Sequence, residues 1–185
     1  MIAAPRAVIS PCRLYRYVLR RDVDPILWTF PPIEGFQVTK SHGKMTFVML
    51  NPSTADAEKD DPTIRRCISF ARGSGAASME VVNLYALRAT NPSELNRGGG
   101  VDPIGPRNDE YILESVHTAD IVICAWGTTD APRKASRIVS TLKIIEECGR
   151  APMCLGVSKF GDPLHPLYLA KTRRPVGLYE ARAAL

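Results

Sequence analysis

The hydrophobic pattern along the chain predicts strands that alternate with helices. Four apolar runs have the length and composition of buried parallel strands, at residues 45–50, 79–87, 119–127 and 151–157. Three segments between them carry apolar residues at helical spacing, at residues 64–72, 108–118 and 132–148. Strands that alternate with helices form a parallel sheet covered on both faces. The pattern therefore predicts an α/β fold, a three-layer α/β/α sandwich with a mostly parallel central sheet.

Local signals mark both ends of the first predicted helix. Asp61 followed by Pro62 is typical of an N-cap with proline at the first helical position. Gly73 and Gly75 follow the last apolar residue and predict the end of the helix.

The two ends of the chain carry weaker patterns than its centre. Within residues 12–30, apolar and charged positions alternate, with Arg16 and Arg20 on one side, which predicts a strand with one solvated face. A core follows at residues 45–170, and residues 171–185 are predicted to be a C-terminal tail. We expect these parts to form a single α/β domain.

Composition agrees with one domain, since 185 residues with 45% hydrophobic content can bury a sizeable core. No apolar run is long enough to span a bilayer. The N-terminus also lacks the sustained apolar stretch of a secretory signal. The sequence therefore predicts a cytoplasmic location without membrane contact, and it leaves the oligomeric state open.

Five cysteines are scattered along the chain without the two-residue spacing of zinc or thioredoxin motifs, at Cys12, Cys67, Cys124, Cys148 and Cys154. We expect them to be structural residues, not disulfides or ligands.

The formal net charge of +5 is compatible with a nucleic-acid or nucleotide partner. Many basic proteins bind neither, so charge alone does not assign a partner.

Polar residues gather where the predicted strands end. Asn51-Pro52-Ser53 follows the first apolar run, and His165-Pro166 follows the last one. Ligands of open α/β sheets bind at the carboxyl ends of the strands. We therefore expect these two segments to meet and line one cleft.

Each candidate residue also has a structural interpretation. The amide of Asn51 can orient a water or contact a base edge, although Asn and Pro are equally common in plain turns. His165, held between two prolines, can donate to negative charge on a leaving group, but it can also be a structural loop residue. Asp56, Asp60 and Asp61 can supply a base, with Asp61 equally explained as a helix cap. We expect no metal site and no cofactor.

Four strings together resemble the domain-of-unknown-function family 1643: MLNPSTAD at residues 49–56, DPTIRRC at 61–67, VVNLYALRAT at 81–90 and HPLYL at 165–169. That resemblance runs from about Cys12 to Leu169 and implies little about activity.

The order of these elements also resembles the uracil-DNA glycosylase superfamily. Asn51-Pro52 is similar to its first motif, Gly-x-(Asp/Asn/Glu)-Pro, which holds the catalytic water. Asn83 stands where that superfamily has an Asn that reads the base, residues 121–127 are similar to its later apolar strand, and His165-Pro166 to its His-Pro-Ser loop.

Three positions depart from that superfamily. Met49 replaces the usual glycine, which changes how closely the backbone approaches a ligand. Ser53 and Thr54 supply no aromatic wall, and Leu167-Tyr168 replaces small residues. These departures point to a different, bulkier base or to loss of glycosylase activity.

The superfamily resemblance implies hydrolysis of an N-glycosidic bond to a damaged or modified base in DNA, with the target nucleotide flipped out of the stack. We expect catalytic roles for Asn51, His165, Asp56 and Asp61. Ligand-binding residues are expected at Pro52, Ser53, Asn83, Tyr85, Trp126, Lys159 and Leu167. Phosphate contacts are expected from Arg65, Arg88, Arg173 and Arg174, with Leu167, Tyr168 or Leu169 wedged into the DNA. An enzyme acting on free nucleotides or nucleosides, and a binding protein without turnover, are the alternatives.

Overall fold

The computed structural model describes residues 6–24, 43–53, 59–91, 94–95, 100–128 and 134–185. Within these residues one seven-stranded sheet has the strand order β1-β2-β4-β3-β5-β6-β7. Its strands are β1 Ala7–Ile9, β2 Arg16–Asp22, β3 Gly43–Met49, β4 Ala76–Asn83, β5 Ile121–Cys124, β6 Pro152–Cys154 and β7 Val176–Gly177. The helices are α1 Pro62–Gly73, α2 Asn108–His117, α3 Lys134–Glu147, α4 Leu178–Ala183 and the short 3-10 helix η2 Pro166–Tyr168.

The sheet is parallel only at its centre. Strands β4, β3, β5 and β6 run parallel, as the sequence predicts. At one edge β2 pairs antiparallel with β4 and β1 with β2, while β7 pairs antiparallel with β6 at the other. The prediction of a mixed α/β fold is confirmed, and the prediction of a mostly parallel sheet holds for its four central strands.

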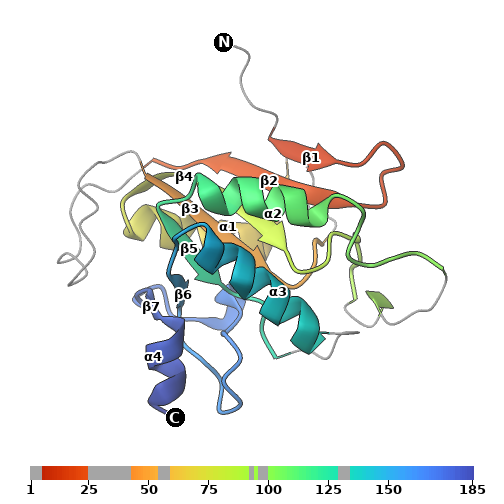
Figure 1. Ribbon diagram of the computed structural model, residues 1–185. Helices are drawn as coiled ribbons and strands as arrows, with labels where there is room; N and C mark the ends of the chain where they lie inside the picture. Colours follow the sequence, from red (N-terminus) through yellow and green to blue (C-terminus); the bar gives the residue numbers. More distant parts are fainter. Residues whose placement is uncertain (1–5, 25–42, 54–58, 92–93, 96–99, 129–133) are drawn as a thin grey trace.

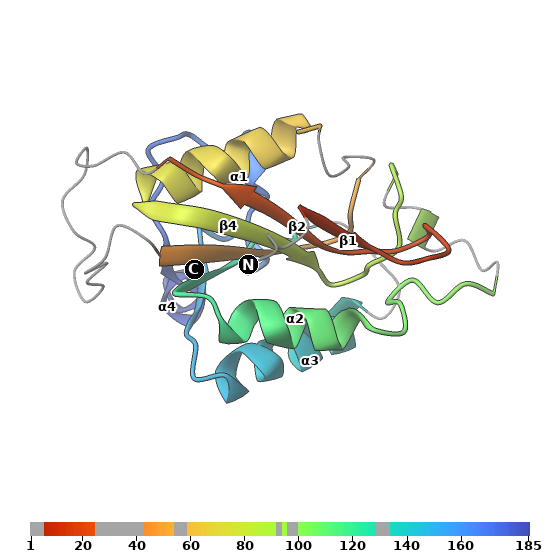
Figure 2. The same ribbon diagram turned by 90° about the horizontal axis from the view of Figure 1, so that it is seen from above.

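Helices cover both faces of the sheet. Figure 2 shows α1 on one face and α2 with α3 on the other. Alternate residues of β3 supply the two cores, because successive side chains of a strand point to opposite faces. Phe47 and Met49 pack in the cluster that contains Ile64 of α1, while Val48 packs with Ile112 of α2.

The strand order creates a switch point between β3 and β5. From β3 the chain passes through α1 to β4 on one side, and from β5 it passes through α3 to β6 on the other (Figure 1). The connections leave in opposite directions, so a crevice forms at the carboxyl ends of these two neighbouring strands.

Helix α1 begins as predicted. The Asp61 carboxylate accepts a hydrogen bond from the backbone N–H of Ile64 at 2.8 Å, and Pro62 occupies the first turn. The helix ends at Gly73, and Gly75 has a φ of 77°. This cap places Asp61 next to the segment that follows β3.

The prediction that one face of β2 is exposed to solvent is wrong. On that face Arg16 is 2% exposed and the Arg20 side chain 22%, while Arg21 on the opposite face is 4% exposed. The strand lies inside the sheet, between β1 and β4, and the Tyr17 ring stacks on Tyr111 of α2 at 4.8 Å. Arg21 is tolerated in this position because it pairs with Asp60 at 2.7 Å. A local alternation of apolar and charged residues does not reveal such distant partners.

Residues 171–185, predicted as a tail, contain β7 and α4. Strand β7 extends the sheet beside β6, and Leu178 of α4 is fully buried. None of the helices described is both long and apolar enough to cross a membrane. All five cysteines are free thiols: Cys67, Cys124 and Cys154 are buried, as structural residues are, whereas Cys148 is half-buried and Cys12 is exposed. Burial raises the pKa of Cys67 and Cys124.

Candidate functional site

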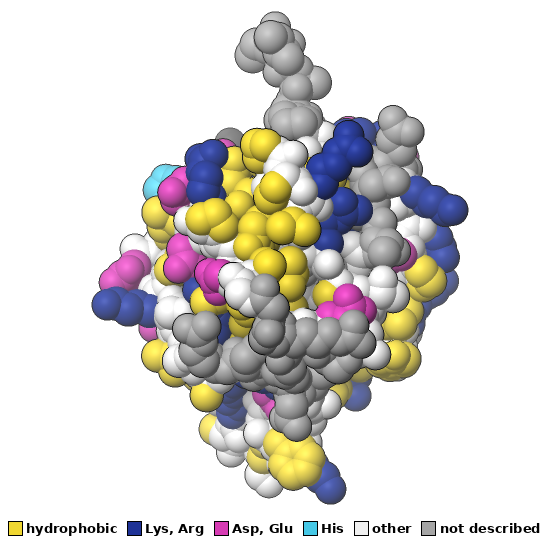
Figure 3. All heavy atoms as spheres, turned by 90° about the vertical axis from the view of Figure 1, so that its right-hand side faces the viewer, with side chains coloured by type: hydrophobic (Ala, Val, Ile, Leu, Met, Phe, Trp, Pro, Cys, Tyr) yellow, Lys and Arg dark blue, Asp and Glu magenta, His cyan; other side chains and the backbone are white. Residues whose placement is uncertain are grey.

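A cleft of about 430 Å³ lies at the carboxyl ends of β3 and β5. Its lining comes from four separate parts of the chain: Met49, Leu50, Asn51, Thr90, Trp126, Gly127, Thr128, Leu164, His165, Tyr168 and Leu169. Figure 3 looks onto this end of the molecule, where hydrophobic side chains gather near the upper centre and Lys and Arg side chains at the upper right. The cleft has the size of a small-molecule site and lies where the switch point predicts one.

The structure brings Asn51 and His165 to the same cleft, as the sequence predicts. Asn51 follows β3 directly, and His165 precedes η2, more than a hundred residues later. Hydrogen bonds connect the loop after β5 with the loop that carries His165: Lys134 Nζ donates to the Gly127 carbonyl at 3.1 Å and to Asp162 at 3.3 Å. The Gly127 N–H donates to the Pro163 carbonyl at 2.9 Å.

The side chain of Asn51 has a determined orientation. Its Nδ2 donates to the carbonyls of Ala89 at 2.9 Å and Pro52 at 3.2 Å. Two carbonyl acceptors require the nitrogen on that side, so Oδ1 points the other way. Oδ1 accepts no hydrogen bond from the described residues, which leaves it as an acceptor for water or ligand.

His165 is held as a neutral donor. Its Nδ1 accepts a hydrogen bond from the Leu167 N–H at 3.3 Å, which assigns the proton of the neutral ring to Nε2. Burial lowers the pKa of His165, and the nearby Asp61 only partly opposes that shift. The Nε2–H group of this half-buried ring at the cleft can therefore donate to a ligand oxygen or nitrogen without carrying a charge.

Trp126 and Gly127, which follow β5, form another part of the cleft wall. Trp126 is 1% exposed, and its Nε1 has no hydrogen-bond partner in the described structure. Gly127 has a φ of 74°, and a Cβ placed there would lie 3.5 Å from the Cβ of His165. A side chain at Gly127 would be strained by this positive φ, although its Cβ would only be in ordinary van der Waals contact with His165.

A smaller side pocket of about 80 Å³ adjoins the cleft and shares Met49, Asn51 and His165 with it. Its polar lining adds Arg16, Ser53, Asp61 and Asn83. Asn83 is 1% exposed, and its Nδ2 has no hydrogen-bond partner among the described residues. We use the name side pocket for this space below.

Asp61 is occupied by structural contacts. One carboxylate oxygen caps α1, and the other accepts a hydrogen bond from the Ser53 hydroxyl. The expected base role of Asp61 therefore competes with two contacts that hold the segment after β3. Asp56, also expected to be catalytic, lies outside the described residues.

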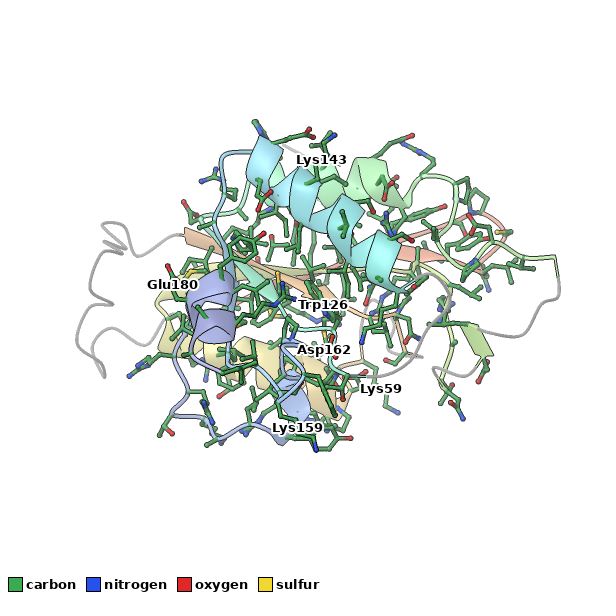
Figure 4. The ribbon with its side chains drawn as sticks, turned by 60° about the horizontal axis from the view of Figure 1, so that its bottom comes forward. Lys59, Trp126, Lys143, Lys159, Asp162 and Glu180 are labelled. Atoms are coloured by element: carbon green, nitrogen blue, oxygen red, sulfur yellow. The ribbon has the colours of Figure 1, made fainter. Side chains whose placement is uncertain are left out.

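Four of the expected ligand-binding residues line neither the cleft nor the side pocket: Pro52, Tyr85, Lys159 and Leu167. Tyr85 is 1% exposed and packs in the core on the α2 and α3 face. Leu167 does not line the cleft, whereas its neighbours Tyr168 and Leu169 do. Lys159 is exposed, with its ammonium 5.0 Å from the Phe160 ring, and lies at the edge of the molecule in Figure 4, whereas Trp126 lies near its centre. Pro52 is buried and contributes a carbonyl that accepts from Asn51.

The four predicted phosphate-binding arginines do not line the cleft or the side pocket. Arg65 is exposed on α1 and donates to the Asp60 carbonyl at 2.6 Å, and Arg88 donates to the Arg13 carbonyl at 3.4 Å. Arg173 is exposed and Arg174 half-buried, both between η2 and β7.

Sequence reasoning missed Arg16, Thr90 and Lys134. Arg16 begins β2, which is antiparallel to β4, and this pairing places it beside the carboxyl end of β4. Its position in an alternating pattern indicated solvent, and no local signal shows the antiparallel pairing. In the described part of the chain no three His, Cys, Asp or Glu residues gather into a metal-binding group.

Among the comparisons with known proteins, only the one with sequence-family models finds a match. No curated protein and no solved structure matches it significantly. The resemblance to the uracil-DNA glycosylase superfamily therefore stays a prediction. A family model described as "Protein of unknown function (DUF1643)" matches residues 16–167, which include both Asn51 and His165. The chain belongs to this DUF1643 family.

Proposed function

We propose that the cleft binds a damaged or modified nucleobase of DNA and that the protein hydrolyses its N-glycosidic bond. One observation carries the proposal: the Oδ1 acceptor of Asn51 and the neutral Nε2–H donor of His165 line the same cleft, and the fold uses neither atom. An acceptor for water and a donor for the leaving group are the two parts that this hydrolysis needs.

His165 would act on the departing base. When the glycosidic bond breaks, the base leaves with the electron pair and carries negative charge. The Nε2–H group of a neutral imidazole stabilises that charge by donating a hydrogen bond, and the imidazole keeps its proton. The lowered pKa of His165 supports this state at neutral pH, because burial disfavours the imidazolium.

Asn51 would hold the attacking water. Its amide is fixed by the carbonyls of Ala89 and Pro52, so Oδ1 can accept a hydrogen bond from water in one orientation. An amide does not accept the proton of water, so the proton leaves to solvent after the water oxygen bonds to the anomeric carbon. The departing base anion takes up a proton from solvent, so the products are a neutral free base and a sugar hydroxyl.

Tyr168 supports DNA as the source of the base. It lines the cleft, yet its side chain is 83% exposed. An exposed aromatic side chain at the mouth of a base-sized cleft suits insertion into a duplex from which one nucleotide has been extruded.

The test is incubation with duplex oligonucleotides that carry uracil, hypoxanthine or modified pyrimidines, followed by detection of abasic sites and free base. We expect one of them to be cleaved by the wild-type protein and not by His165→Ala. Tyr168→Ala should lose activity on the duplex and keep it on a single strand, because only the duplex requires extrusion. Intact binding without product from any of these substrates would overturn the hydrolytic proposal.

A second candidate is a nucleotide- or base-binding protein without turnover. The observation that favours it is the occupied carboxylate of Asp61, whose oxygens are taken by Ser53 and the helix cap. Among the described residues that line the cleft there is then no free carboxylate to act as a base. This candidate predicts that His165→Ala weakens binding of nucleotides or nucleosides while no product forms with either protein.

A further inference from the structure

A short hairpin, residues 157–163, follows β6, and its arms form one antiparallel bridge. The Gly161 N–H donates to the Ser158 carbonyl at 2.9 Å, which closes a β-turn. Lys159 and Phe160 are the two central residues of that turn, and both are exposed. The hairpin therefore presents an aromatic ring and an ammonium group to solvent at its outermost point.

Contacts with two helices hold the hairpin in place. Arg182 of α4 donates to the Gly161 carbonyl at 2.9 Å, and Lys134 of α3 donates to the Asp162 carboxylate at 3.3 Å. Because the turn is already ordered, the Phe160 ring loses little conformational entropy when it contacts a partner.

No packing requirement in the described structure accounts for the exposed Phe160 ring. Its side chain is 76% exposed, and among the large hydrophobic side chains described only Tyr168, at 83%, is more exposed. Turns favour Gly, Pro, Asn, Asp and Ser, so neither local geometry nor burial requires phenylalanine at this position. The two rings lie in one segment, on either side of His165 in the sequence. Two exposed aromatic side chains so placed indicate a surface that contacts a partner beside the cleft.

The hairpin adjoins the cleft. Leu164 and His165, which follow it directly, line the cleft, and its Pro163 carbonyl accepts a hydrogen bond from Gly127, also in the lining. Phe160 is four residues before Leu164, and such a stretch spans at most about 14 Å. That distance corresponds to about four steps of a DNA strand at roughly 3.4 Å each. A strand with one nucleotide in the cleft can therefore bring another base to the Phe160 ring.

Two exposed cations accompany the ring. The Lys159 ammonium lies 5.0 Å from the centre of the Phe160 ring. Arg173 lies at the base of the hairpin, since a Cβ placed on Gly156 would be 3.2 Å from its Nη1 and 3.4 Å from Cδ1 of Leu164. An aromatic ring on which a base stacks, with cations near enough for phosphates, is the combination that single-stranded nucleic acids bind.

We propose that Phe160 stacks on an unpaired base of the DNA strand that enters the cleft, while Lys159 and Arg173 contact phosphates of that strand. The stacked base is a neighbour of the target nucleotide and not the target itself. In a duplex each base is already stacked on its neighbours, so this contact favours single-stranded DNA. The inference rests on the proposed function only in taking DNA as the partner, and it does not require hydrolysis.

Two oligomers with equal numbers of phosphates test the stacking contact by fluorescence anisotropy: a thymidine oligomer of about 12 nucleotides and an abasic oligomer of the same length. Phe160→Ala should bind the thymidine oligomer about tenfold more weakly, because one stacked base is lost, and the abasic oligomer as tightly as the wild type does. Phe160→Trp keeps a stacking surface and should retain the affinity. An unchanged affinity of Phe160→Ala for the thymidine oligomer, or an equal loss for both oligomers, overturns the proposal.

Charge variants and a remote variant are the controls. Lys159→Gln and Arg173→Gln should weaken the binding of both oligomers alike, and each should reduce the slope of log affinity against log salt concentration by about 0.7. Val139→Ala removes a similarly exposed side chain from α3 and should leave both affinities unchanged. If Phe160→Ala instead lost binding to phosphatidylserine vesicles and kept its affinity for thymidine, the turn would be a membrane contact and the proposal would fail.

Base release, measured in parallel, distinguishes this inference from the hydrolytic proposal. Weaker thymidine binding by Phe160→Ala, without base release from any substrate, leaves this inference standing and overturns the hydrolytic proposal. Base release by the wild type, with no effect of Phe160→Ala on binding, has the reverse meaning.

Discussion

Strand β4 carries two buried polar residues three positions apart, and they differ in what surrounds them. Glu80, towards the amino end of the sheet, is bonded to Arg20 at 2.7 Å, to Lys44 at 2.8 Å and to the Ser115 hydroxyl. Asn83, at the carboxyl end, has an Nδ2 group without any partner among the described residues. The same strand thus has one polar group fully used by the fold and another that the fold leaves unused.

The difference separates structure from function. The contacts of Glu80 join β2, β3, β4 and α2, so this carboxylate stabilises the packing of helix on sheet. Burial by itself would raise the pKa of Glu80, but the hydrogen bonds from Lys44, Ser115 and Arg20 outweigh it and lower the pKa. Asn83, Trp126 and His165 instead keep donors available where β3, β4 and β5 end. These three donors lie at the same end of the sheet, and we take them as the candidates for contact with a ligand.

The largest expected effect on this difference between Glu80 and Asn83 comes from removing the Glu80 carboxylate. Glu80→Ala should lower the free energy of unfolding by about 3 kcal/mol, because it leaves two cations and a hydroxyl without their shared acceptor. Urea titration measures the change, and Glu80→Gln, which keeps one acceptor, should cost less. A change below about 0.5 kcal/mol would show that this network does not stabilise the fold.

At the other end, His165→Ala should affect function more than stability. Loss of the Nε2–H donor is expected to reduce base release about 100-fold, or to weaken ligand binding if no turnover exists. His165→Gln, whose amide can place a donor near the same point, should retain part of the activity. Equal activity of the wild type and His165→Ala would show that the imidazole has no role in the site.

Asn83→Leu should have the opposite sign to Glu80→Ala in stability. Because it removes an unpartnered buried amide, the free energy of unfolding should stay unchanged or rise by about 1 kcal/mol. Urea titration in the absence of ligand is the measurement. A loss of stability comparable to that of Glu80→Ala would mean that Asn83 is a structural residue after all.

The smallest expected effect is a difference in how the two ends respond to acid. Burial lowers the pKa of His165, so its contribution to stability is complete above the unfolded pKa of about 6.5 and is lost as the pH falls below it. The pKa of Glu80 is also lowered, so its contribution is present above about 4.3 and lost as the pH falls through the lower folded pKa.

The free energy of unfolding, measured from pH 8 to pH 3, should fall in both pH ranges, which we call the upper window (His165) and the lower window (Glu80). His165→Gln should flatten the upper window and Glu80→Gln the lower one. If His165→Gln left the upper window unchanged, His165 would not be the group that titrates there.

Local sequence patterns were sufficient for the elements and for part of the site. The apolar runs predicted the four central strands, and Asp61-Pro62 predicted the start of α1, because caps and periodicity depend on neighbours in the chain. Polar residues after strands pointed to Asn51, Trp126 and His165, which line the cleft. The same reasoning wrongly placed Arg16 in solvent and included Tyr85, which is buried in a core.

By itself, the sequence determined where strands and helices form and which polar groups follow the strands, since both depend on residues a few positions apart. Only the tertiary structure decided that β4 and β5 flank β3, that β2 adds antiparallel beside β4, and that Arg16 and Asn83 therefore share one small pocket. The physical reason is that strand pairing joins segments distant in the chain, and its energy comes from contacts that no local pattern contains.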